Sequence, residues 1–119
     1  IQLVAELPHH GIVGFLSGGP ERSGDSRFSG KLYAIYLLDA FHRRGLGTAL
    51  VQHWALRLHQ ASLPSGLVWV LAQNQSAATF YERLGGKFLR EQIITIGTQQ
   101  LPERAYGWED LGTLIPLPR

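Results

Sequence analysis

The sequence predicts a mixed α/β fold in a single domain, built on a central sheet that is mostly antiparallel. Three observations predict this fold: apolar runs of strand length occupy much of the chain, two segments show the 3.6-residue period of helices, and strands alternate with helices only in the middle. A helical connection lets the next strand run in the same direction. The alternating middle therefore predicts one parallel pair at the centre of the sheet.

The first third of the chain predicts a hairpin, a loop and a central strand. Residues 1–6 and 12–17 have strand patterns, and Pro8-His9-His10-Gly11 forms a turn between them. Residues 18–30 are rich in glycine, serine and charge, which is typical of a loop. Residues 32–38 are apolar on both faces, as expected of a strand in the middle of a sheet.

Two helices and a strand between them follow. Leu46, Leu50, Trp54 and Leu58 recur every four residues, with Val51 and Ala55 beside them, which predicts an amphipathic helix over residues 45–60. Residues 67–71 form a buried strand. Asn74 is the predicted N-cap of a short helix that reaches residue 84, where two glycines end it.

The last third predicts two more strands. They cover residues 88–96 and 104–111, with a turn at 97–102 and a tail at 114–119 that contains two prolines. The predicted order is β-β-β-α-β-α-β-β. A ligand is expected at the carboxyl ends of the central strands.

Composition limits the functional classes. The 119 residues are 45% hydrophobic and 17% charged with a net charge of +2, which is too little charge for a nucleic-acid-binding surface but suits a small polyanionic ligand. The sequence has no cysteine, so disulfides, thiolate metal sites and cysteine nucleophiles are excluded. We expect a cytoplasmic protein with no membrane span and no metal site, and we interpret His9 and His10 as surface histidines.

The most informative stretch is the turn between the central strand and the long helix. Residues 39–50 place Gly45 and Gly47 where the helix starts, behind Arg43 and Arg44. Backbone N–H groups at a helix start bind phosphate, and the two arginines add positive charge. The spacing Gly-x-Gly-Thr fits neither the dinucleotide-binding nor the nucleotide-hydrolysing loop. We interpret it as a pyrophosphate-binding turn of a third kind.

Two motifs resemble the GNAT superfamily of acyl-CoA-dependent N-acetyltransferases. The first is the strand Leu32-Tyr33-Ala34-Ile35-Tyr36-Leu37-Leu38 followed by Arg43-Arg44-Gly45-Leu46-Gly47-Thr48, which is similar to the family's fourth strand and pyrophosphate loop. The second is Asn74-x-x-Ala77-x-x-Phe80-Tyr81-Glu82-x-Leu84-Gly85, which resembles the helix on the other side of the cofactor. Residues 103–111 also resemble a bacterial subgroup. The resemblance covers residues 1–111 and implies a single GNAT-like domain whose central parallel strands splay apart.

The chain departs from the family pattern at three places. His42 stands where the loop has Gln or Arg, and Lys31 stands where many relatives carry a glutamate. The chain also begins inside an apolar run without an initiator methionine. We expect that the family's N-terminal strand and two helices, which form one wall of the acceptor pocket, are missing.

The resemblance implies acetyl-CoA as cofactor and assigns roles to particular residues. The cofactor-binding residues are Leu37, Leu38, Arg43, Arg44, Gly45, Leu46, Gly47, Thr48, Asn74 and Tyr81. Tyr81 is the general acid that protonates the leaving thiolate, and the N–H of Leu37 stabilises the oxyanion. Tyr33, Tyr36 and Trp108 are candidate acceptor-binding residues, although Trp108 fits a core position equally well. Glu103, Tyr33, Tyr36 or a bound water is the candidate base.

The predicted function is transfer of an acetyl group from acetyl-CoA to a primary amine of a small molecule or peptide in a ternary complex. The predicted partners include neither nucleic acid nor membrane, and a homodimer is possible on the family's precedent. The first alternative is an acyl-CoA-binding or regulatory module without turnover. The second is a phosphate-binding interaction domain unrelated to coenzyme A.

Overall fold

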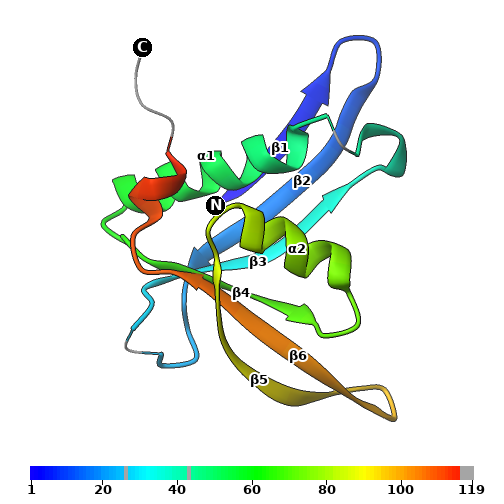
Figure 1. Ribbon diagram of the computed structural model, residues 1–119. Helices are drawn as coiled ribbons and strands as arrows, with labels where there is room; N and C mark the ends of the chain where they lie inside the picture. Colours follow the sequence, from blue (N-terminus) through cyan, green and yellow to red (C-terminus); the bar gives the residue numbers. More distant parts are fainter. Residues whose placement is uncertain (26, 43, 116–119) are drawn as a thin grey trace.

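The computed structural model describes residues 1–25, 27–42 and 44–115 (Figure 1). The elements follow one another as β1 (Gln2–Leu7), β2 (Gly11–Pro20), β3 (Gly30–Leu37), the 3₁₀ turn η1 (Asp39–Phe41), α1 (Leu46–Gln60), β4 (Gly66–Leu71), α2 (Gln75–Arg83), β5 (Lys87–Ile96), β6 (Gln99–Trp108) and the 3₁₀ turn η2 (Leu111–Leu114). The predicted mixed α/β fold and its order of strands and helices are confirmed. Within the described ranges, no helix combines the length and apolarity needed to cross a membrane.

The six strands form one sheet in the order β1-β2-β3-β4-β6-β5. Neighbours are antiparallel except β3 and β4, which are parallel. That parallel pair is short: it runs from Gly30↔Gly66 to Leu32↔Val68, while both strands continue for several residues beyond it. The central strands therefore part toward their carboxyl ends, as the resemblance to the GNAT superfamily implies.

Both helices cover the same face of the sheet (Figure 1). The apolar stripe of α1 is buried at Leu50, Val51, Trp54, Ala55 and Leu58, as its periodicity predicts. It shares one core cluster with β2, β3 and β4, and α2 adds Tyr81 to the same cluster. The structure therefore has one layer of helices packed on one layer of sheet. In this arrangement the carboxyl end of β3 lies beside the N-terminal ends of both helices.

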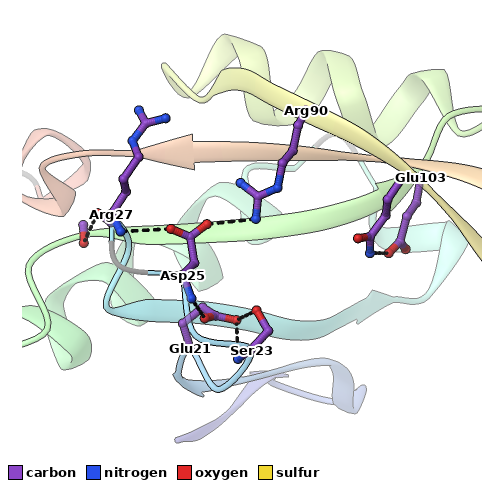
Figure 2. Close-up of polar contacts among 8 residues, drawn as sticks. Glu21, Ser23, Asp25, Arg27, Arg90 and Glu103 are labelled. Carbon is purple, nitrogen blue, oxygen red and sulfur yellow. Dashed lines mark hydrogen bonds and ion pairs between the residues drawn. The ribbon is translucent and has the colours of Figure 1, made fainter.

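The loop after β2 covers part of the other face of the sheet (Figure 2). Asp25 accepts hydrogen bonds from the Arg90 guanidinium (2.9 Å) and from the Arg27 amide (2.9 Å). The Arg90 guanidinium lies 5.3 Å from the ring centre of Trp69, whose neighbours along β4, Val68 and Val70, belong to the helix-covered core. Successive side chains of a strand alternate between faces. Asp25 and Arg90 therefore tie this loop to the face opposite the helices.

The end of the sequence was predicted incorrectly in two respects. The strand β6 begins at Gln99 and ends at Trp108, whereas the sequence suggested a turn at 97–102 and a strand at 104–111. Pro102 does not interrupt the strand, because it lies one residue beyond the last β4 partner, Leu71↔Glu103, and its own carbonyl accepts from Ala72 (2.9 Å). Residues 111–114 form η2, which buries Leu111 and Leu114.

Candidate functional site

A cleft of about 780 Å³ opens where β3 and β4 part. Three segments line it: the end of β3, the glycine turn, and α2 from its N-cap to its last residue. The lining residues are Ile35, Tyr36, Leu37, His42, Gly45, Gly47, Thr48, Asn74, Gln75, Ser76, Ala77, Thr79, Phe80 and Arg83. The structure thus brings together the two motifs that the sequence singled out, although the end of the first, Thr48, and the start of the second, Asn74, lie 26 positions apart along the chain.

The two glycines of the turn differ in how strictly their positions require glycine. Gly45 is the N-cap of α1 and has a φ of 77°, in the left-handed region that costs other residues energy. Gly47 lies in the first turn of α1, where a Cβ atom would stand 3.4 Å from Cζ of Phe80 on α2. That distance is an ordinary van der Waals contact, so this position accepts a methyl group.

Backbone amides at the start of α1 are available to a ligand. The Ala49 N–H is bonded to the Gly45 carbonyl (3.0 Å), so the N–H groups of Leu46, Gly47 and Thr48 precede the first intrahelical bond. Among the described residues, no side chain caps this end of the helix. The partial positive charge of the helix start favours an anion at this place.

The second helix turns a polar face toward the same cleft. Asn74 caps α2, since its Oδ1 accepts from the Ala77 N–H (3.2 Å), and this confirms the predicted N-cap. Ser76, Thr79 and Arg83 line the cleft with helical spacing. Of the described residues that line the cleft, none is acidic, and Arg83 and His42 supply its cationic or protonatable groups. The electrostatics of the cleft therefore suit a polyanion.

The backbone of Leu37 faces the gap between the central strands. The Leu38 N–H donates to the Val13 carbonyl on the β2 side (2.9 Å). Backbone groups of successive residues in an antiparallel pair point to opposite sides, so the N–H and C=O of Leu37 point away from β2. The Leu37 carbonyl accepts from Nε2 of His42 (2.8 Å).

Two other predicted cofactor-binding residues lie at the edge of this cleft or beyond it. Leu38 uses its N–H in the bond to β2, and its side chain is exposed. Arg44 is exposed and its guanidinium stands 5.3 Å from the ring centre of Phe41. Arg43, also a predicted cofactor-binding residue, lies outside the described residues.

Tyr81 and Trp108 lie in the core. Tyr81 is 2% exposed and Trp108 is 3% exposed, and their rings meet edge to face at 6.0 Å. Burial raises the pKa of Tyr81 to about 12. The Trp108 indole N–H donates to the Leu84 carbonyl (3.1 Å), which is the bonding expected of a structural tryptophan. Phe80 lines the cleft, and the centres of the Phe80 and Tyr81 rings are 5.2 Å apart. Tyr81 therefore lies directly behind the cleft lining.

The remaining candidates for the acceptor side are exposed or half-buried. Tyr36 is 54% exposed and lies 6.2 Å from Phe15 on β2, ring centre to ring centre. The Tyr33 hydroxyl donates to the Pro20 carbonyl (2.6 Å). Glu103 accepts a 2.6 Å bond from Nε2 of Gln92 on β5 (Figure 2).

Sequence reasoning missed several cleft residues. Gln75, Ser76, Thr79 and Arg83 were not singled out, and His42 was noted only as a departure from the family pattern. The polar residues of α2 recur at positions 76, 79 and 83, so a polar stripe of helical period was the signal available in the sequence. In the described part of the chain, no group of three or more metal-ligating side chains is found.

Comparison with known proteins gives one family and several relatives. The model of the FR47-like protein family matches residues 21–94. The chain is 39% identical over 114 residues to the uncharacterized N-acetyltransferase YuaI of Bacillus subtilis (strain 168), covering 96% of this chain and 65% of that protein. The chain thus spans just under two thirds of the length of this curated relative.

Two solved structures share the fold. Smu.2055 from Streptococcus mutans UA159 has a TM-score of 0.75 at 26% identity, covering 92% of this chain and 69% of that one. Arabidopsis thaliana NAA60 in complex with acetyl-CoA has a TM-score of 0.68 at 14% identity, covering 82% and 65%. The match to the family model extends over more than half of the sequence, includes both cleft motifs and ends within β5. The chain therefore belongs to the FR47-like family and has the GNAT fold.

Proposed function

We propose that this chain transfers an acetyl group from acetyl-CoA to a primary amine of a small molecule or peptide, by direct transfer in a ternary complex. One observation carries the proposal: free amides at the start of α1 face a polar, acid-free side of α2, beside a strand edge that is open for pairing. The relative named as an N-acetyltransferase and the fold neighbour with bound acetyl-CoA support the same conclusion.

The cleft offers separate positions for the two halves of the cofactor. The diphosphate fits the amides of Gly45, Leu46, Gly47 and Thr48, with the Thr48 hydroxyl as a further donor. Arg83 lines the cleft and adds positive charge to it, and we also assign Arg43 and Arg44 to cofactor binding. The pantetheine arm pairs with the backbone of Leu37 like an added strand, and Asn74 lies beside its path.

The chemistry then needs an oxyanion donor and an acid. The amine nitrogen attacks the thioester carbon, and the Leu37 N–H hydrogen-bonds to the oxygen as it becomes negative, which is worth about 3 kcal/mol. The C–S bond breaks as the intermediate collapses. Tyr81 gives its phenolic proton to the thiolate, and the proton lost by the amine goes to Glu103, Tyr33, Tyr36 or a bound water.

Coenzyme A binding to the glycine turn tests the proposal. Gly47→Asp places bulk and negative charge among the amides and is expected to abolish CoA binding in isothermal titration calorimetry. Gly47→Ala is the matched control: its Cβ meets Phe80 at an ordinary distance, and we expect at most a tenfold loss. Equal affinity of the wild type and Gly47→Asp would show that CoA binds elsewhere.

A second candidate function is an acyl-CoA-binding module without turnover. It is favoured by the burial of Tyr81, whose phenol must reach the cofactor sulfur to act as the acid. One assay distinguishes the two functions: acetyl-CoA is supplied with a panel of amines, and the release of free thiol is measured. Binding without amine-dependent thiol release is the result expected of the module.

A further inference from the structure

The Leu37 carbonyl is the outermost backbone acceptor of β3 in the gap between the central strands. It points away from β2, and the pairing of β3 with β4 has already stopped at Leu32↔Val68. In a continuous sheet a neighbouring strand would donate an N–H to this oxygen. No β4 residue among those described does so, which leaves the oxygen to another donor.

His42 is that donor. Its Nε2 lies 2.8 Å from the Leu37 oxygen. A carbonyl oxygen only accepts, so Nε2 carries the hydrogen and donates it. The turn η1 places the ring there, because the His42 N–H bonds to the Asp39 carbonyl (3.1 Å) and folds the chain back toward the end of β3.

The imidazole ring of His42 and a bound pantetheine arm would occupy the same position next to the Leu37 carbonyl. Both His42 and Leu37 line the cleft, and a strand-like arm donates to Leu37 from within the gap, where the imidazole now stands. We propose that His42 is a positioning residue that holds the Leu37 carbonyl in the cofactor-free chain and is displaced from it when the arm binds. This inference rests on the proposed binding of coenzyme A.

The displacement has a predictable cost. A hydrogen bond of this kind contributes about 0.5–1.5 kcal/mol net, which corresponds to an affinity change of roughly two- to twelvefold. Only ligands that contain the pantetheine arm lose this binding free energy, because only they displace His42. ADP has a diphosphate for the glycine turn but no pantetheine, so its binding leaves the contact between His42 and Leu37 intact.

Nitrogen-15 NMR of the imidazole rings tests the displacement directly. The His42 signals are assigned by their loss in His42→Gln, and spectra of the full chain are recorded alone, with ADP and with CoA. We expect the Nε2–H tautomer alone and with ADP, and the averaged tautomers of a freely exposed histidine with CoA. A ring that CoA leaves unchanged, or that ADP changes equally, overturns the inference.

The amides of Gly45 and Gly47 in the same samples report the proposed function separately. If CoA shifts these amides but leaves the His42 ring unchanged, the inference fails while cofactor binding stands. If CoA shifts neither, the proposed function fails and the inference with it.

The ratio of CoA affinity to ADP affinity provides a second measurement. His42→Ala removes the competing donor and is expected to raise this ratio by about two- to twelvefold. His42→Gln keeps an N–H donor of similar reach and is expected to hold the ratio near the wild-type value. An unchanged ratio in His42→Ala, or an equal rise in His42→Gln, contradicts the inference.

Discussion

Tyr81 combines a position beside the cleft with a phenol that stays protonated. If Tyr81 is the acid, Tyr81→Phe lowers kcat at least tenfold, because the thiolate leaves without a proton donor, and leaves CoA affinity within about twofold. Steady-state kinetics of thiol release and calorimetry with CoA measure the two effects.

Tyr106→Phe is a matched control for this substitution. The Tyr106 hydroxyl is also buried, and among the described residues it has no hydrogen-bond partner of good geometry. Removing it is therefore expected to leave kcat unchanged. Wild-type turnover by Tyr81→Phe would show that another group, or water, protonates the thiolate.

The raised pKa of Tyr81 also predicts a pH dependence of stability. The folded chain keeps this phenol protonated up to about pH 12, whereas the unfolded chain loses the proton near pH 10. Between these values the unfolded state binds fewer protons, so the free energy of unfolding falls as pH rises. Relative to Tyr81→Phe, the wild type is expected to lose up to about 3 kcal/mol between pH 10 and 12 in urea titrations. If the difference in free energy of unfolding between the wild type and Tyr81→Phe stays constant over this pH range, the Tyr81 phenol is in contact with water in the folded chain.

Local sequence patterns predicted some residues of the site and not others. Gly45 and Asn74 follow from turn and capping chemistry, which acts over a few residues. Tyr81 came from the family resemblance, and its burial depends on Trp108, 27 positions away. The bond from His42 to Leu37 requires both the parting of the strands and one ring orientation, and a linear pattern contains neither.

At the scale of elements, the start of α2 contributes both stability and part of the cleft. Asn74→Ala removes the oxygen that accepts from Ala77 and is expected to lower the free energy of unfolding by about 1 kcal/mol. Urea unfolding measures this loss. Gln75→Ala, one residue later and without the capping bond, is expected to change stability by less than 0.5 kcal/mol. Equal effects of the two substitutions would show that the cap does not stabilise the helix.

The prediction of elements succeeded where periodicity was long and failed at the turn predicted for residues 97–102. The stripe of α1 extends over four turns and predicted every buried position of that helix. The predicted turn ended at Pro102, but this proline belongs to β6 and lies beyond the end of β4, where the strand needs no N–H from it. Whether a proline breaks a strand depends on its neighbour in the sheet, which the local sequence does not specify.

For the whole molecule, the loop tied by Asp25 predicts an acid-sensitive contribution to stability. The hydrogen bond from the Arg27 amide, aided by that from Arg90, lowers the pKa of Asp25. The folded value lies below the unfolded one, so the contribution is present above the unfolded pKa and is lost as pH falls through the folded pKa. Asp25→Asn is expected to lower the free energy of unfolding by about 1 kcal/mol at pH 7. The difference between wild type and variant is expected to become smaller below about pH 4.

Arg27→Gln is the control for this substitution. It keeps the backbone N–H that bonds Asp25, and it removes the exposed pair of Arg27 with Glu109 (3.4 Å) and the contact of the guanidinium with the Phe28 ring (5.3 Å), so we expect a smaller loss in urea unfolding than for Asp25→Asn. If Arg27→Gln lowers the free energy of unfolding as much as Asp25→Asn does, surface charge and not the hydrogen bonds of Asp25 explains the loss of stability.

The overall arrangement was predictable because helices and strands alternate only in the middle of the chain. That pattern requires a parallel pair at the centre, and the structure has one. The sequence did not indicate that the loop after β2 is held on the open face. This attachment joins Asp25 to Arg90 across 65 positions, and residues rich in glycine and serine give no sign of such a distant partner.

The short seam between β3 and β4 has a mechanical consequence. Three residue pairs join β1–β2–β3 to β4–β6–β5, while the antiparallel ladders within each half are longer. The fewest backbone pairs of the sheet therefore join its two halves at the centre, and α1 packs across this junction. A change in the angle between the two halves would alter the width of the cleft while leaving the longer ladders within each half intact.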